Sequence, residues 1–232
     1  MPYLPGWPAP DPMDAADLER IKQAFVQATH RADRAGFDII QLHIAHGYLL
    51  HQFLSPITNT RNDAYGGSPE GRMRYPLEVF KAVRDAFPAE KPVMVRLSAT
   101  DWIEGAWNID QSIDFCRNLK DLGCDMVDVT SGGLDQAQQI TVGPGYQVDF
   151  SARIRAEAGM ATMAVGQITD PVQAETILST GQADMVALAR GMLWDPRWTW
   201  NAAVALDEEI TLPAPYARCN PKLRTTPFVT RK

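Results

Sequence analysis

The four histidines of the chain gather within residues 30–51. His43 and His46 stand three residues apart and are followed by a glycine and then Tyr48. Imidazole and phenol groups at this spacing suit two kinds of chemistry: metal binding, and hydrogen-bond or proton donation to a substrate. No carboxylate or cysteine stands at a spacing typical of a metal site, so we expect no metal here. For His30 and His51 we expect a neutral structural role.

Further polar and glycine residues follow the other apolar runs of the chain. In chain order, after the histidines, these groups are Arg96 with Ser98 and Asp101, residues 130–133, Gly166, and Arg190 with Gly191. The carboxyl ends of parallel strands meet at one side of a sheet and form the active face of α/β proteins. We therefore expect these groups to share one face. Arg190 and the last glycines also suit a phosphate site.

Five short apolar runs predict the strands that position these groups, because they are rich in β-branched residues and alternate with segments of helical spacing. The runs are FDIIQLHI, KPVMVRLS, CDMVDVT, MATMAVG and ADMVALAR. A first helix is predicted from Asp14, in a capping arrangement, to a terminal Gly36. Proline after Ser68, Asp170 and Asp195 predicts three further helix starts. This alternation predicts βα units and a parallel sheet, without a composition break that marks a second domain.

Composition excludes several classes of protein. The chain has 232 residues, of which 45% are hydrophobic and 22% charged, as in a globular protein with a core. A net charge of −6 argues against nucleic-acid binding, although the residues from Tyr216 onward carry only basic charges, which we interpret as a solvated tail. No apolar run is long enough to predict a membrane span. The N-terminal residues do not have the pattern of a secretory signal. Three cysteines without a CxxC pair favour a reducing cytoplasm over a disulfide framework, a zinc site or an iron–sulfur cluster.

One long motif is specific. The segment LHIAHGYLLHQFLSPITNTRNDAYGGSPEGRMRY resembles the Old Yellow Enzyme family of FMN-dependent ene-reductases, and the resemblance continues through VRLSATDW, VTSGG, PGYQVDF, AVGQITDP and ALARGMLWDPRW. It covers about residues 14–218. The paired histidines are similar to the thermophilic-type, xenobiotic-reductase-like branch. The resemblance implies a (β/α)8 TIM barrel that binds FMN at the carboxyl ends of its strands and uses NADPH or NADH as reductant.

The resemblance also implies catalytic roles. Hydride reaches the β-carbon of an activated alkene, and negative charge grows on the carbonyl or nitro oxygen of an enone-type substrate. His43 and His46 would donate hydrogen bonds to that oxygen, which stabilises the charge in the transition state. Tyr48 would deliver a proton to the α-carbon as a general acid. Outside this motif, a partly buried loop tyrosine would be the simpler interpretation of Tyr48.

Cofactor and subunit contacts follow from the same resemblance. Arg96 would lie beside the pyrimidine edge of the flavin, where a cation favours the anionic reduced ring. Gly166, Ala189 and Arg190 would bind the phosphate, because glycine permits close approach and arginine can hold two oxygens. Arg218, at the end of PAPYAR, would reach the substrate site of a neighbouring subunit. The predicted protein is thus a homo-oligomer or is completed by another chain.

The predicted barrel is incomplete. Residues 1–13 are a proline-rich irregular lead, residues 14–210 a partial barrel of five βα units that align with strands 4 to 8, and residues 211–232 a C-terminal extension. The lead is too short for strands 1 to 3. A five-stranded sheet leaves two edges with unpaired backbone groups, which invite association. Another polypeptide, the tail, or a second copy of the chain would cover them, or the chain is a truncated product.

Three functions compete. The first is an FMN-dependent ene-reductase or its carboxyl-terminal portion. The second is a truncated or non-catalytic partial barrel that needs a partner chain to bind flavin. The third, a larger multidomain flavin dehydrogenase, is disfavoured because relatives of that kind carry a cysteine cluster after the barrel, where this chain has only Cys219.

Overall fold

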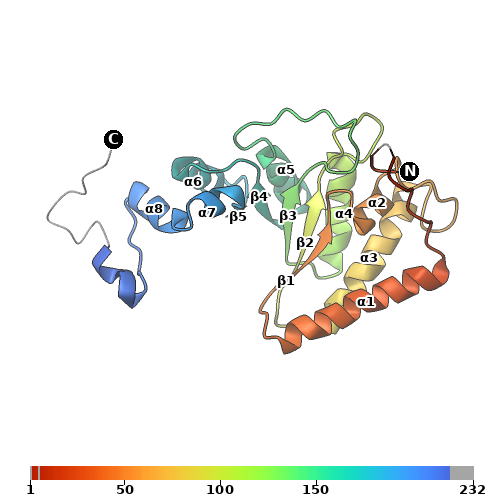
Figure 1. The fold of residues 1–232 in the computed structure, drawn as a ribbon, viewed down its shortest axis with the longest axis horizontal. Helices are drawn as coiled ribbons and strands as arrows, with labels where there is room; N and C mark the ends of the chain where they lie inside the picture. The colour runs from red at the N-terminus through yellow and green to blue at the C-terminus, as the bar shows by residue number, and fades with distance from the viewer. Residues whose placement is uncertain (1, 5, 220–232) are drawn as a thin grey trace.

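The computed structural model describes residues 2–4 and 6–219 as five βα units in sequence (Figure 1). No helix or strand occurs in the described residues before α1. The strands are β1 (Ile40–Ile44), β2 (Val93–Ser98), β3 (Met126–Thr130), β4 (Ala161–Val165) and β5 (Met185–Ala187). The helices are α1 (Ala15–Arg34), α2 (Leu49–Leu54), α3 (Pro69–Ala86), α4 (Ile109–Asp121), α5 (Val148–Ala158), α6 (Pro171–Ser179), α7 (Arg190–Trp194), α8 (Trp198–Ala205) and the 3-10 helix η1 (Ala214–Cys219). All five predicted strands are confirmed.

The sheet is parallel throughout, and its strands lie in the order in which they occur along the chain. Among the described residues, β1 and β5 each pair on one side only, so the sheet is open at both edges, as predicted. Apolar side chains are exposed beside these edges: Ile39 is 49% exposed next to β1, and Met185 is 47% exposed on β5. These edges resemble surfaces that associate with other strands.

Local chemistry explains where the first helices begin and end. Asp14 caps α1 by accepting from the backbone N–H of Asp17, whose side chain in turn accepts from the backbone of Asp14. Gly36, beyond the end of α1, has a φ of +82°, the left-handed conformation that glycine adopts without strain. The predicted starts at Ser68 and Asp170 are also confirmed, because each side chain caps its helix. The start predicted at Asp195 is wrong.

The reason is local. The Asp195 carboxylate instead accepts from the backbone N–H of Arg197 and from the Asn201 side chain, which forms a turn, and α8 begins at Trp198.

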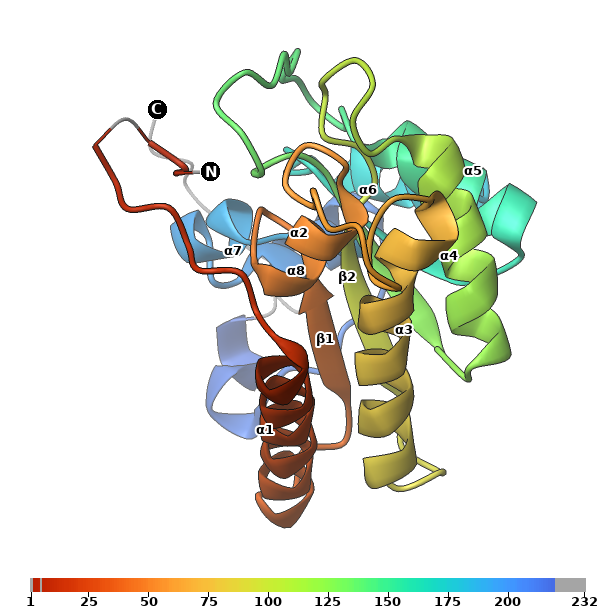
Figure 2. The ribbon, with the colours of Figure 1, turned by 90° about the vertical axis from the view of Figure 1, so that its right-hand side faces the viewer.

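The core lies between one face of the sheet and the helices α1, α3, α4 and α5. Figure 2 shows α1 and α3 side by side along β1, and these two helices are in contact. Leu42, Val95 and Val127 point into this core and are nearly or fully inaccessible. Because side chains alternate along a strand, the residues between them point to the opposite face of the sheet. That opposite face carries the candidate site.

Among the residues that the structure describes, none of the helices has both the length and the apolar character needed to cross a bilayer.

Candidate active site

Three aromatic side chains meet just beyond the carboxyl end of β1. The ring centroids of His43 and His46 are 5.2 Å apart, and the edge of Tyr48 approaches His43 at a centroid distance of 5.4 Å. His43 lies on β1, His46 in the turn that follows, and Tyr48 at the residue that precedes α2. Tyr48 is 66% exposed, so its phenol is open to an incoming molecule. The structure therefore groups the three residues whose catalytic roles the sequence predicts.

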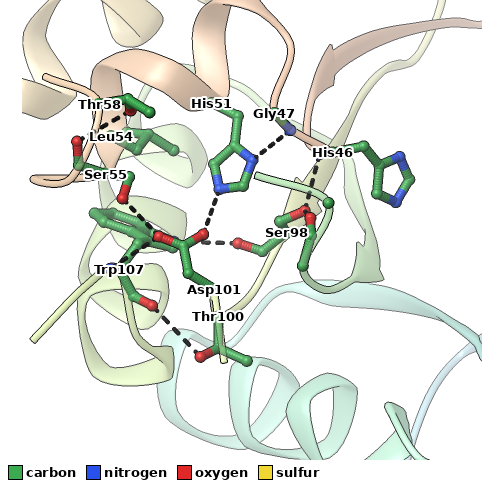
Figure 3. Close-up of polar contacts among 12 residues, drawn as sticks. His46, Gly47, His51, Leu54, Ser55, Thr58, Ser98, Thr100, Asp101 and Trp107 are labelled. Carbon is green, nitrogen blue, oxygen red and sulfur yellow. Dashed lines mark hydrogen bonds and ion pairs between the residues drawn. The ribbon is translucent and has the colours of Figure 1, made fainter. Parts of the chain in front are cut away.

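The turn between β1 and α2 has an unusual backbone. His46 has a φ of +57° and Gly47 a φ of +74°, so two consecutive residues adopt the left-handed conformation. For a residue with a Cβ atom this conformation carries a cost. Both backbone N–H groups are bonded to buried side chains: His46 N–H donates to Ser98 Oγ at 3.0 Å, and Gly47 N–H donates to His51 Nδ1 at 3.0 Å (Figure 3). These bonds offset the cost and hold the backbone from which the His46 ring projects.

Both site histidines are neutral at neutral pH. Burial lowers the pKa of His43, and the Arg96 cation acts in the same direction. Burial, followed by Arg96, lowers the pKa of His46 to about 4. A neutral imidazole has one N–H donor, and its partner determines which nitrogen carries the proton.

His46 already has such a partner. Its Nε2 lies 2.9 Å from Thr130 Oγ1, whose own hydroxyl donates to Gln147 Oε1. The threonine oxygen thus accepts the Nε2 proton of His46. His43 Nε2, in contrast, is buried without a hydrogen-bond partner in the structure. His43 Nε2 is thus the ring nitrogen without a partner, and a substrate oxygen would compete with Thr130 for His46.

Arg96 stands next to this cluster on β2. It is the register partner of His43 on one side and of Asp128 on the other. Its Nε lies 3.4 Å from Asp128 Oδ2, an ion-pair contact without hydrogen-bond geometry. Asp128 is 3% exposed, and burial raises its pKa against the opposing effect of Arg96. A row of polar side chains thus crosses β1, β2 and β3 on the face away from the core.

The residues predicted for phosphate binding follow the last two strands. Gly166 comes directly after β4, while Ala189 and Arg190 come just after β5, which pairs with β4. These three residues therefore lie together at the carboxyl end of the strands. Gly166 has a φ of +135°, and a Cβ atom there would lie 3.0 Å from Gln147 Nε2 and 3.2 Å from the Tyr146 ring. Arg190 is exposed, and no hydrogen bond or ion pair occupies its guanidinium within the described part of the chain.

Arg218 lies elsewhere. It belongs to η1, which Figure 1 shows at the far end of the long axis from α2. The structure does not bring it to the histidines of its own chain, and its predicted contact with a neighbouring subunit stays a prediction. The tail beyond Cys219 lies outside the described residues.

Sequence reasoning missed Asp128 and Gln147. Asp128 is a charged residue in the middle of an apolar strand, CDMVDVT, which is a signal for a functional polar group on the face of the sheet away from the core. Gln147 is 2% exposed, accepts from Ser131 Oγ at 2.5 Å and donates to Val165 O at 2.8 Å. It links the ends of β3 and β4, a role that no sequence spacing reveals.

Several cavities open in the described part of the structure. One of about 790 Å³ opens beside His46 and Tyr48, and Tyr3 and Trp7 of the N-terminal lead also line it. This volume suits a small organic molecule. Another, of about 700 Å³, lies among α1, α3 and α4 and contains none of the predicted site residues. Within residues 2–4 and 6–219, no group of three or more His, Cys, Asp or Glu side chains is placed to hold a metal ion.

Comparisons with known proteins concern the family and the fold of the chain. Residues 8–209 match the model of the NADH:flavin oxidoreductase / NADH oxidase family. The chain is 44% identical over 218 residues to an NADPH dehydrogenase of Geobacillus thermodenitrificans, with 94% of this chain and 63% of that protein covered. It is 45% identical over 209 residues to an NADPH dehydrogenase of Bacillus subtilis, with 90% and 61% covered. The chain thus spans less than two thirds of these relatives.

Solved structures give the fold. Morphinone reductase superposes with a TM-score of 0.69 at 29% identity, covering 90% of this chain and 54% of that one. An old yellow enzyme homologue from Zymomonas mobilis superposes with a TM-score of 0.70 at 24% identity, covering 88% and 56%, and this likeness concerns the fold alone. The open sheet is a partial barrel of the (β/α)8 type, as predicted from the sequence.

Proposed function

The chain belongs to the NADH:flavin oxidoreductase / NADH oxidase family, and from this membership we propose that it carries the active face of an FMN-dependent ene-reductase. The reaction would pass hydride from NADPH or NADH through the flavin to the C=C bond of an α,β-unsaturated carbonyl or nitro compound. The observation that carries the proposal is the meeting of His43, His46 and Tyr48 beside Arg96. This set combines hydrogen-bonding imidazoles, a phenol and a fixed cation at the carboxyl end of the strands.

The residues present fit a flavin. Arg96 Nε is a buried donor and His43 Nε2 a buried ring nitrogen, and neither has a hydrogen-bond partner in the structure, on the face of the sheet away from the core. Buried donors are rarely left without a partner, which supports an acceptor-rich group at this place. Arg96 would hold the ring, and Gly166, Ala189 and Arg190 the phosphate. When bound, FMN would supply the hydride.

The side chains of the chain would handle charge and protons. His43, neutral and with an unpartnered Nε2, would donate to the substrate oxygen, and His46 would join it by exchanging its bond to Thr130 for one to the substrate. Two such donors stabilise negative charge on that oxygen as the transition state forms. Tyr48, exposed to the cavity, would hold the proton for the α-carbon.

A spectroscopic experiment tests this proposal. We expect the purified chain with FMN to be yellow, to be bleached by NADPH and to be reoxidised by cyclohexenone. The double variant His43→Ala and His46→Ala should weaken the binding of a phenolic ligand, whereas His30→Ala, a histidine exposed on α1, should not. Protein that neither binds FMN nor reacts with NADPH would exclude activity of the chain alone. Unchanged phenol binding in the double variant would contradict the proposed role of the histidines.

A second candidate rests on the open sheet. The unpaired outer sides of β1 and β5 favour a partial barrel that binds flavin only with a partner chain or a second copy. Arg218 would then contribute to the site of a neighbouring subunit. Colourless protein that becomes yellow on mixing with such a partner would support this candidate. A yellow monomer, measured by light scattering, would contradict it.

We also propose a cytoplasmic location. Cys116 and Cys124 are buried and unpaired, and Cys219 is exposed and unpaired. Free thiols persist in a reducing compartment. Fractionation of the producing cells tests this, and recovery of the protein outside the cytoplasm would contradict it.

A further inference from the structure

We propose that His51 and Asp101, a buried pair that does not line the substrate cavity, act as positioning residues that hold the turn carrying His46 and Tyr48 in its productive conformation. The inference rests on the proposed function, because it assigns these two residues to the same site. Neither side chain has any exposed surface, and neither lines the cavity beside Tyr48.

The pair contacts the turn directly. Gly47 N–H donates to His51 Nδ1 at 3.0 Å, and His51 Nε2 lies 2.9 Å from Asp101 Oδ1 in a close polar contact without hydrogen-bond geometry (Figure 3). Since Nδ1 accepts a hydrogen bond, it carries no proton, and the ring proton is on Nε2, facing the carboxylate. His51 is therefore a neutral imidazole with one defined tautomer. Only this tautomer offers an acceptor to Gly47.

Asp101 is itself fixed. Its Oδ2 accepts from Ser55 Oγ at 2.6 Å and from the backbone N–H of Trp107 at 3.1 Å, and both donors are buried. With Oδ2 occupied in this way, Oδ1 is left for His51. Ser55 ends α2, and Asp101 follows β2, so the carboxylate ties the far end of α2 to the neighbouring strand. The His51 ring extends this connection to the near end of the same helix.

The turn needs this support because its backbone is strained at His46, whereas Gly47 adopts the same conformation without strain. His46 and Gly47 both have positive φ angles, and their N–H groups point to Ser98 Oγ and His51 Nδ1. Ser98 donates in turn to Gly132 O at 2.9 Å, so its acceptor is also defined. Figure 3 shows the His46 ring directed away from this buried network. The network holds the backbone of His46 and Gly47, and this backbone sets the position from which the His46 ring projects.

Three variants separate positioning from simple packing. His51→Asn places an amide oxygen near the position of Nδ1 and preserves the acceptor. His51→Leu keeps an apolar filling and removes the acceptor. Asp101→Asn places an amide donor toward His51, which favours the reversed tautomer and so turns an N–H toward Gly47. All three change buried volume or polarity, but only the last two remove the bond to Gly47.

The measurements are two. Long-range proton–nitrogen NMR of the full chain with labelled histidine should show His51 protonated on Nε2, and should show His46 shifted in His51→Leu and Asp101→Asn but little changed in His51→Asn. In FMN-loaded protein, titration with para-chlorophenol should give an affinity about tenfold weaker in His51→Leu and within about threefold of wild type in His51→Asn.

The outcomes are distinguishable. A His51 proton on Nδ1, or equal His46 shifts in His51→Asn and His51→Leu at matched thermal stability, would overturn the positioning role. Absence of FMN or phenol binding in the wild-type chain would count against the proposed function, while the NMR comparison would still decide whether the pair holds the turn.

Discussion

His43 and Arg96 are register partners on the adjacent parallel strands β1 and β2, and both point away from the hydrophobic core. A cation thus stands beside an imidazole that burial already keeps neutral, and both effects lower the pKa of His43. The same cation lowers the pKa of His46. Arg96 therefore has two consequences in this site: it supplies positive charge and it preserves the histidines as neutral donors.

Replacement of Arg96 tests this relationship. In Arg96→Met the pKa values of His43 and His46 should both rise, because the repulsion of a second positive charge is lost. Arg96→Lys, which preserves the charge, should leave them closer to wild type. Titration of the histidine ring protons by NMR measures both. Identical titration curves for the methionine and lysine variants would show that burial alone sets these pKa values.

His46 makes the stability of the protein pH-dependent. Its pKa is about 4 in the folded protein and 6.5 in an exposed histidine, so between these values the unfolded state binds more protons. The free energy of unfolding should therefore be highest above pH 6.5 and should fall by about 3 kcal/mol as the pH drops to 4. Urea unfolding at a series of pH values measures this slope.

The matched variant is His46→Asn, because asparagine accepts a positive φ and does not titrate. It should reduce the slope in this pH window. An unchanged slope would assign the acid sensitivity to other groups.

Gly47 should tolerate no side chain. Its φ is +74°, and a Cβ atom would lie 2.5 Å from Gly133 O. Gly67 has a φ of +72° with open space around it, which makes it a control with the same backbone conformation. Gly67→Ala should cost about 1 kcal/mol, and Gly47→Ala about 2 kcal/mol more, because a backbone carbonyl must move. Equal losses of unfolding free energy in the two variants would contradict the close contact.

The open edge at β1 should promote association. Ile39 is 49% exposed beside this edge, and Val142 is 56% exposed in a loop away from the strands. A charge at an edge strand disfavours pairing with another strand. Ile39→Lys should therefore lower the apparent mass at high protein concentration, whereas Val142→Lys should not. Analytical ultracentrifugation measures the mass, and equal effects of the two variants would exclude the β1 edge as the contact.

Local sequence determined much of the fold. The alternation of apolar runs with capped helical segments predicted all five strands, because strand and helix periodicities are properties of neighbouring residues. Asp14 and Gly36 marked the ends of the first helix through chemistry confined to a few residues. The start predicted at Asp195 was wrong because its carboxylate forms a turn with Arg197 and Asn201 instead.

In the candidate site, too, the sequence identified some residues and not others. The sequence identified His43, His46, Tyr48 and Arg96 by their type and by the strand ends that they follow. It could not identify the roles of His51, Asp101, Asp128 and Gln147, since each depends on partners that are remote in the chain. Asp101, for example, meets His51 across 50 positions, and Thr130 reaches His46 across 84.

By itself, then, the sequence determined the order of the elements, the polar groups at the carboxyl ends of the strands and the family resemblance. Only the tertiary structure decided that His46 Nε2 is bonded to Thr130 while His43 Nε2 has no hydrogen-bond partner, because this depends on how neighbouring strands are placed. It also decided the backbone conformation at His46, where bonds to Ser98 and His51 stabilise an angle that local preference disfavours. Local periodicity specifies the helices and strands, and contacts between them specify the hydrogen-bonding state of the site histidines.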